Sequence, residues 1–246
     1  MRTALFNGMS MKLLTTANAK TIHGESLGIL TGILYLSPET SAKLCPYASE
    51  ECKALCLVNS GRAEIFPMVN KARARKTLEF LSDRSAFVET LRKDIQALER
   101  KAQRENMRAA VRLNGTSDIL WEKLTPLMEE FPAVQFYDYT KVPLKYRATR
   151  NNYHLTFSFS GHNWMECESA LAHGTNVAMV FDKLPKAHRG YRVIDGTIHD
   201  VRFLDGAQGV IVGLCAKGKR ARTAAKAGSA FIVKADPQEA KHNDND

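Results

Sequence analysis

The stretch Gly28-Ile-Leu-Thr-Gly-Ile-Leu-Tyr-Leu-Ser-Pro38 decides how the fold begins. A short, continuous apolar run bounded by Gly and Pro is typical of a strand buried on both faces. This run leads into Leu44-Cys-Pro-Tyr-Ala-Ser-Glu-Glu-Cys-Lys-Ala-Leu-Cys-Leu-Val-Asn59, which carries three of the chain's five cysteines. A cysteine-rich loop that leaves a strand and enters a helix can hold a metal ion or an iron–sulfur cluster. The sequence therefore predicts a metal centre in loop 44–59, at the end of the first buried strand.

The spacing of these cysteines suits metal ligands. Cys52 and Cys56 are four residues apart, so on a helix their sulfur atoms share one face. Cys45 precedes a proline and can fold back toward them from the loop. Three thiolates leave one coordination position of a metal centre open. We therefore predict Cys45, Cys52 and Cys56 as ligands, with Cys215, at the end of a later strand, as the candidate fourth.

Other interpretations of the cysteines stay open. Two of them could form a disulfide, but the first residues lack the long apolar core of a signal peptide, so we expect an intracellular protein with reduced thiols. Unliganded thiols that pack as small apolar groups suit the isolated Cys167 and Cys215 better than the triplet. Zinc is the alternative to an iron–sulfur cluster, although catalytic zinc more often uses His and carboxylate ligands.

The net charge of +9 favours an anionic partner, such as a nucleotide or a nucleic acid. Much of the excess lies in segments 71–76 and 217–226, although both could simply be solvated faces. No apolar run is long enough to span a bilayer, so a soluble protein is expected. The residues predicted to contact phosphate groups are Lys217, Lys219, Arg220 and Arg222.

The rest of the chain alternates between apolar strands and helices. Segment 83–105 is the clearest helix, because its apolar residues recur every three or four positions from Phe87 to Leu98. Segment 191–204 is read as a hairpin-like insertion or a partly buried polar segment, 1–27 as an N-terminal arm and 236–246 as a flexible tail. Further helices are expected at 63–81, 119–131 and 163–173, and further strands at 109–114, 134–140, 153–159, 176–181 and 209–214.

Short apolar strands separated by helices indicate a parallel sheet with crossover helices. About six such units without a glycine-rich dinucleotide motif favour a barrel over a doubly wound sheet. We therefore predict an α/β fold, a partial (β/α)6 TIM-like barrel, in a single domain over residues 28–235. In such barrels the chemistry gathers where the strands end.

Polar residues follow the predicted strands at those ends. Asp118, Asp138 and Lys141 are the candidate catalytic residues, and Asn114, Asp118 and Tyr139 are the candidates for cofactor binding. Each acid has a structural alternative: Asp118 could cap a helix, and Asp138 could be the buried partner of an arginine or of backbone amides. Lys141 is either a catalytic amine or a surface lysine that packs its aliphatic chain.

Three segments together resemble the phage gene product 88 family. They are Cys45-Pro with Cys52 and Cys56-Leu, Arg112-Leu-Asn-Gly-Thr-Ser-Asp118, and Phe136-Tyr-Asp-Tyr-Thr-Lys141. The resemblance spans roughly residues 13–233. It implies a phage or prophage origin, and therefore a location in the cytoplasm of a bacterial host.

A second, architectural resemblance is to the radical S-adenosylmethionine (SAM) enzymes. These are partial (β/α)6 barrels in which three cysteines after the first strand hold a [4Fe-4S] cluster and SAM occupies the open iron. The spacing departs from that family: six residues separate Cys45 from Cys52 and three separate Cys52 from Cys56, against three and then two. No Gly-Gly-Glu segment follows the second strand either.

Two functions follow as hypotheses. The first is an iron–sulfur protein that uses SAM on a nucleotide or nucleic-acid substrate. The second is a protein without catalysis, in which a cluster or zinc stabilises the fold and the basic surface binds DNA or RNA.

Overall fold

The computed structural model describes residues 12–17, 19–38, 44–56, 66–216 and 218–236. The end of the predicted cysteine loop, Lys217 and nearly all of the predicted tail lie outside the described residues. None of the helices in these described ranges combines the length and the apolar character needed to cross a lipid bilayer.

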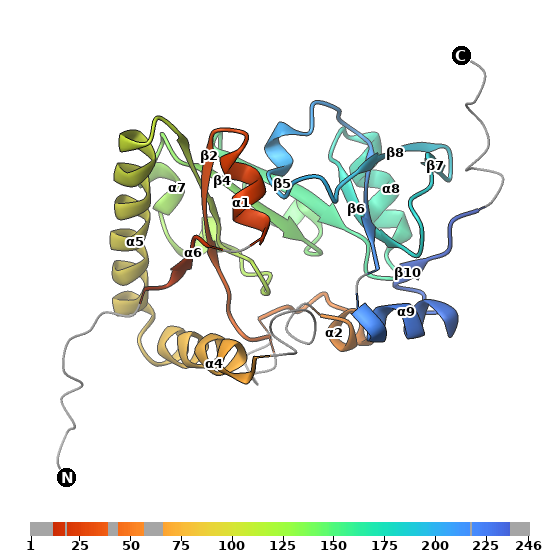
Figure 1. The fold of residues 1–246 in the computed structure, drawn as a ribbon, viewed down its shortest axis with the longest axis horizontal. Helices are drawn as coiled ribbons and strands as arrows, with labels where there is room; N and C mark the ends of the chain where they lie inside the picture. The colour runs from red at the N-terminus through yellow and green to blue at the C-terminus, as the bar shows by residue number, and fades with distance from the viewer. Residues whose placement is uncertain (1–11, 18, 39–43, 57–65, 217, 237–246) are drawn as a thin grey trace, which may run out of the picture.

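One mixed sheet runs through the molecule (Figure 1), and over the described residues it has ten strands. At the edges, β1 (Leu14–Thr15) pairs antiparallel with β2, and β7 (Ala187–His188) pairs antiparallel with β8. A short strand near the end of the chain, β10 (Ile232–Val233), pairs parallel with β6. Between the edges lie seven parallel neighbours: β2 (Ile29–Leu34), β3 (Arg108–Arg112), β4 (Gln135–Thr140), β5 (Tyr153–Ser158), β6 (Val177–Phe181), β9 (Ile211–Cys215) and β8 (Tyr191–Asp195).

The prediction of a parallel α/β domain is confirmed, whereas the barrel is not. From β2 to β6 the strands lie side by side in chain order, as a singly wound sheet requires. Over the described residues, however, the sheet is open and ends in the antiparallel strands β1 and β7. Neither a TIM barrel nor a radical-SAM-like fold is therefore established.

Helices cover the sheet and one of its ends. The long helix α5 (Arg84–Arg104) packs on β2 and β3, and its N-terminus is capped by Asp83, which accepts a hydrogen bond from Ala86 N at 2.9 Å. In Figure 1, α4 (Pro67–Ser82), α2 (Glu50–Ala54) and α9 (Gly218–Lys226) lie in a row at the end of the sheet toward which β2 leads. Farther along the sheet, α8 (Trp164–Ala172) packs on β5 and β6.

Two large hydrophobic clusters fill most of the core, and a small third one consists of Ile29, Ala110, Tyr137 and Val201. The larger lies among α5, β2, β3 and β4, and it buries the predicted stripe of α5, including Leu91 and Ile95. The smaller lies among α8, β5, β6 and β9. Strand β5 contributes Tyr153 to the larger cluster and Phe157 to the smaller, so the two are parts of one packed body.

Some predicted elements differ in the structure. The helix expected over 119–131 is two short helices, α6 (Trp121–Leu124) and α7 (Leu127–Glu130), because Pro126 lacks the N–H that a continuous helix needs and Thr125 before it is extended. The N-terminal segment expected as an arm contains β1 and α1 (Ala19–Glu25). Segment 191–204 supplies β8 and a 3-10 turn (Arg202–Leu204), with β8 adding to the main sheet.

Candidate functional site

A cavity of about 400 Å³ opens at the end of the sheet where β3, β4, β5 and β9 finish. Its wall combines the loops after these strands with α1, α2, α9 and segment 196–200. All of the predicted site residues except Asp138 line it: Cys45, Cys52, Cys56, Asn114, Asp118, Tyr139, Lys141 and Cys215. Residues more than a hundred positions apart in the sequence thus face one space.

The loop after β3 is bonded to the segment after β2. Gly115 N donates to Leu34 O at 2.9 Å, and the Thr116 hydroxyl donates to Leu36 O. A Cβ atom on Gly115 would lie only 2.6 Å from Leu34 O, so this close approach requires glycine. Asp118 N donates to Leu44 O at 2.7 Å, immediately before Cys45. The β3 loop therefore positions the start of the cysteine segment.

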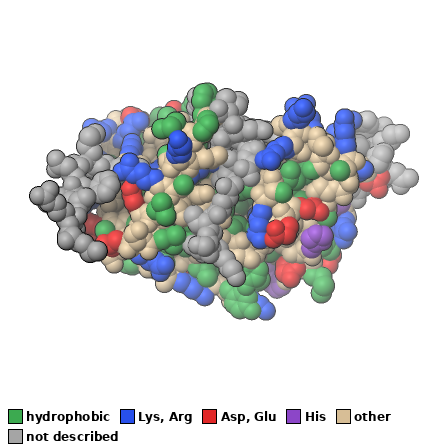
Figure 2. Space-filling model, turned by 90° about the horizontal axis from the view of Figure 1, so that it is seen from below, with side chains coloured by type: hydrophobic (Ala, Val, Ile, Leu, Met, Phe, Trp, Pro, Cys, Tyr) green, Lys and Arg blue, Asp and Glu red, His purple; other side chains and the backbone are tan. Residues whose placement is uncertain are grey.

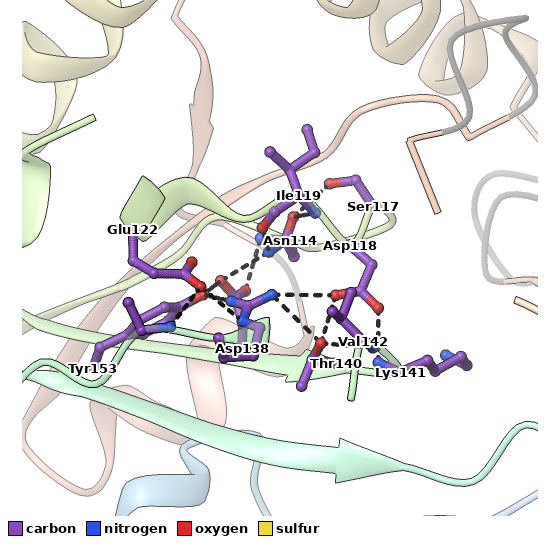
Figure 3. A network of polar contacts seen from close by, with 12 residues as sticks. Asn114, Ser117, Asp118, Ile119, Glu122, Asp138, Thr140, Lys141, Val142 and Tyr153 are labelled. Atoms are coloured by element: carbon purple, nitrogen blue, oxygen red, sulfur yellow. Dashed lines mark hydrogen bonds and ion pairs between the residues drawn. The ribbon is translucent and has the colours of Figure 1, made fainter. Parts of the chain in front are cut away.

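Asp118 ties this loop to the end of β4 (Figure 3). Its carboxylate accepts hydrogen bonds from Thr140 Oγ1 at 2.8 Å and from Lys141 N at 2.7 Å, and it lies 3.5 Å from the Arg147 guanidinium. It does not cap α6, whose N-cap position is Leu120. With all of these partners the carboxylate is engaged, and its observed role is to shape the cavity wall.

Asp138 lies on the opposite side of the sheet from Tyr139 and does not line the cavity. It accepts hydrogen bonds from Asn114 N at 2.7 Å and from Tyr153 Oη at 2.8 Å, in the network drawn in Figure 3. Burial raises the pKa of this carboxyl to about 7, although nearby Arg112 acts to lower it. Asp138 is thus placed as the buried partner of a backbone amide, the structural alternative that its sequence context allowed.

Lys141 points away from this network in Figure 3 and lines the cavity. Within the described ranges, no acceptor lies within hydrogen-bond or ion-pair distance of its Nζ atom. Burial acts to lower the pKa of Lys141, but the negative charges of the ionised Cys52 and Cys45 sulfurs and of Asp118 outweigh it, and the net shift is upward. The side chain is therefore a charged ammonium beside the thiols.

The short helix α2, which carries Cys52, is held at its N-terminal end by Ser49 and Glu51. Ser49 caps α2 by accepting from Cys52 N at 3.1 Å, and its hydroxyl donates to Ser160 O at 2.6 Å, after β5. The carboxylate of Glu51 accepts from Ser229 Oγ at 2.6 Å and from Phe231 N at 2.9 Å, just before β10. The cysteine segment is thus held by strand ends from three parts of the chain.

The thiols share the cavity without forming a preformed single-ion site. None of the five cysteines, all of which lie in the described ranges, forms a disulfide. Burial raises the pKa of Cys45 to about 12, although Lys141 acts to lower it. In the part of the chain that the structure describes, no three His, Cys, Asp or Glu side chains are close enough to hold one metal ion. Cys215 lines the cavity at the end of β9, whereas Cys167 is buried in the core under α8.

The structure adds a buried ion pair to the predicted residues. Arg112 Nη1 donates to Asp200 Oδ2 at 2.8 Å, and both residues line the cavity. The Arg112 guanidinium lies over the Tyr139 ring, with Cζ 4.6 Å from the ring centre. The Tyr139 hydroxyl donates a hydrogen bond to Asp200 Oδ1 at 3.3 Å. From the sequence, only Arg112 could have indicated this pair, because a charged residue in an apolar strand needs a partner. Asp200 lies in an irregular segment, and no sequence pattern marks it as the partner.

Basic side chains surround the same end of the molecule. Ala221 of α9 lines the cavity, and its neighbours Lys219, Arg220 and Arg222 are exposed. Figure 2 shows this end, with Lys and Arg side chains on both sides of the face. Lys219, Arg220 and Arg222, the predicted phosphate contacts within the described residues, thus lie next to the cavity.

Comparison with known proteins gives one match. The family model described as gene product 88 matches residues 11–234. No curated protein and no solved structure matches the chain. The architectural resemblance to radical SAM enzymes therefore has no support from the comparisons. The match to gene product 88 covers nearly the whole chain, and the protein belongs to the gene product 88 family.

Proposed function

We propose that this protein binds an iron–sulfur cluster through Cys45, Cys52 and Cys56, next to a cavity that takes a small molecule. One observation carries the proposal: the three thiols line the same cavity as the polar residues after β3 and β4. The family supports a phage or prophage origin. SAM at the open iron position, and a nucleotide or nucleic-acid substrate, are the finer parts of this proposal.

The described residues hold no ready-made site for a single zinc ion. With Zn–S bonds of about 2.3 Å, the thiolates of one tetrahedral ion lie within about 4 Å of one another. No such group of three occurs in the described ranges. In a [4Fe-4S] cluster each thiolate binds a different iron atom, so its ligands are spaced farther apart.

The protein's own groups prepare the site for thiolate binding. With its pKa near 12, the Cys45 sulfur is a protonated thiol at neutral pH, so metal binding must release that proton. The ammonium of Lys141 favours the resulting negative charge. When bound, a cluster with an open iron position supplies electron transfer to a molecule held in the cavity. Asp118 and Asn114 hold the wall of that cavity in place.

The first test is anaerobic purification followed by iron, sulfide and zinc analysis and a visible absorption spectrum. We expect a brown protein with about four irons and four sulfides. The variant Cys45→Ala should lose the colour. Cys167→Ala is the matched control, because its thiol is buried away from the cavity. A colourless protein with one zinc, or equal iron content in Cys45→Ala, would contradict the proposal.

Cys215→Ala then tests the fourth position. If three cysteines hold the cluster, this variant keeps its iron, and SAM should change the spectrum of the reduced protein. If Cys215 closes the site, the variant loses iron and SAM has no effect on the original protein. The second result would indicate an electron-transfer or structural role instead of SAM chemistry.

A second candidate function is nucleic-acid binding without catalysis. The observation that favours it is the exposed basic face of α9 beside the cavity, formed by Lys219, Arg220 and Arg222. Binding would rest on phosphate contacts and would weaken steeply with salt.

A further inference from the structure

In the cavity wall, the carboxylates have hydrogen-bond partners, whereas the cationic groups have donors without acceptors among the described residues. Both carboxylates that line the cavity have partners: Asp118 is bound by Thr140 and Lys141 N, and Asp200 by Arg112 and Tyr139. The two cations of the wall, Arg112 and Lys141, have unused donors. A molecule that completes this cavity must therefore bring acceptors.

Arg112 is the more constrained of the two cations. Its side chain is 6% exposed, and within the described residues the structure gives it one acceptor, Asp200, at Nη1. Its Nε atom is buried and has no hydrogen-bond partner in the part of the chain that the structure describes. Leaving a buried donor of a charged group unpaired is costly, and such donors usually have a partner such as a ligand or an ordered water. The Nη2 atom of Arg112 also has no acceptor among the described residues and, unlike Nε, is not fully buried, so it is the donor that a carboxylate or phosphate oxygen in the cavity can reach.

The residues around Arg112 hold its guanidinium group in place. Asp200 binds the far nitrogen, the Tyr139 ring lies against the guanidinium plane, and Tyr139 Oη is bonded to Asp200 in turn. An arginine fixed in this way loses little further freedom on binding, which is the general condition for tight recognition. Lys141 adds a second positive charge in the same cavity.

Apolar side chains complete the wall. Ala178, Val180 and Leu214 line the cavity from β6 and β9, and Phe159 lines it from the end of β5. Ligand cavities of this size commonly bury an apolar body and orient it through a few polar groups. The ligand that fits is therefore amphipathic.

We propose that Arg112 and Lys141 form a binding site for the oxyanion group of a small organic molecule, a carboxylate or a phosphate monoester, with its apolar body on β6 and β9. This site lies in the cavity of the proposed function and names the class of molecule that the cavity takes. It does not require the cluster, because Arg112 and Lys141 are fixed to β3 and β4.

The test compares ligand pairs that differ only in the oxyanion. Adenosine 5′-monophosphate is compared with adenosine, and benzoate with benzyl alcohol, by isothermal titration of the full chain. We expect the charged member of at least one pair to bind at least about tenfold more tightly. The pair that shows the difference tells phosphate from carboxylate. Equal binding within both pairs, or no binding of any probe, overturns the proposal.

Variants assign the effect to the two cations. Arg112→Lys keeps the charge but removes the planar fork, and Lys141→Gln removes the second charge; each should weaken oxyanion binding about tenfold. Arg104→Gln, on the exposed face of α5, is the matched control and should bind as the original protein does. Unchanged binding in Arg112→Lys overturns the assignment.

The variant Asp200→Asn distinguishes a change in oxyanion binding from a loss of folding, because we expect it to bind the oxyanion more tightly. Asparagine can still accept from Arg112 Nη1 but carries no charge to compete with the ligand, so oxyanion binding should tighten several-fold. Misfolding cannot produce such a gain, and an unchanged or weaker affinity contradicts the proposal. Repeating the titration with Cys45→Ala keeps the two proposals apart: the oxyanion site stands if binding persists without a cluster, and it fails if neither protein binds.

Discussion

Gly115 is the residue at which the loops after β2 and β3 come closest. A Cβ atom there would lie 2.6 Å from Leu34 O and 2.7 Å from Tyr35 Cδ1, and the first of these is backbone that cannot move aside. We expect Gly115→Ala to lower the free energy of unfolding by about 1–3 kcal/mol, measured by urea denaturation. Gly206→Ala is the control, because its Cβ would meet nothing within 4 Å. Equal stability of the two variants would contradict this account of the loop.

Asp138 should make the stability depend on pH. Burial raises its pKa from 3.8 to about 7, so the folded protein binds this proton more tightly than the unfolded chain does. Its contribution to stability is fully present below the unfolded pKa and is lost as pH rises through about 7. Between about pH 5 and about pH 8 the original protein should lose on the order of 3 kcal/mol relative to Asp138→Asn. Parallel curves of unfolding free energy against pH for the two proteins would show that another group is responsible.

At the scale of single elements, α9 carries the test of nucleic-acid binding. The triple substitution Lys219→Gln, Arg220→Gln and Arg222→Gln removes three exposed charges beside the cavity. For a protein that holds DNA through them, the slope of log affinity against log salt should fall by up to ~3, at about 0.9 for each phosphate contact. Fluorescence anisotropy with a labelled duplex at several salt concentrations measures the slope.

The matched control removes three exposed charges from another helix. Arg100→Gln, Lys101→Gln and Arg104→Gln on α5 change the net charge by the same amount, and none of these three residues lines the cavity. A drop in slope of the same size in both triple variants would mean that only the overall charge matters. It would remove α9 as a specific contact surface.

The elements differ in how well the sequence predicts them. Helix α5 is predicted in full, because its cap at Asp83 and its apolar stripe are local signals. The break at Pro126 is also local, and the expectation of one helix over 119–131 was wrong because it passed over that proline. By contrast, β10 has two residues and depends on pairing with β6, so no local pattern marks it.

The same distinction holds for the cavity. Alternation along β4 places Tyr139 and Asp138 on opposite faces, but it does not say which face lines the cavity. The polar strand ends could be predicted, because parallel strands finish at one edge. The pair formed by Arg112 and Asp200 could not, since its members are 88 residues apart and meet only through the packing of the whole chain.

At the scale of the whole molecule, the two large hydrophobic clusters should unfold together. Trp121 lies in the larger cluster and Trp164 packs against the smaller, while β5 contributes to both. The chain has only these two tryptophans, so Trp121→Phe and Trp164→Phe each leave one fluorescent probe. In each variant, the urea midpoint by fluorescence should equal the midpoint by far-ultraviolet circular dichroism. Separate midpoints would show two independent folding units.

The bonds from Glu51 to Ser229 and Phe231 link positions 178 and 180 residues apart. A ribosome makes the thiols of Cys45, Cys52 and Cys56 early and the partners of Glu51 much later. While the chain is being synthesised, α2 therefore lacks this attachment until Phe231 has emerged. The cavity wall that carries the thiols is therefore completed only near the end of synthesis. A ligand that needs the complete wall binds after Phe231 has been added to the chain.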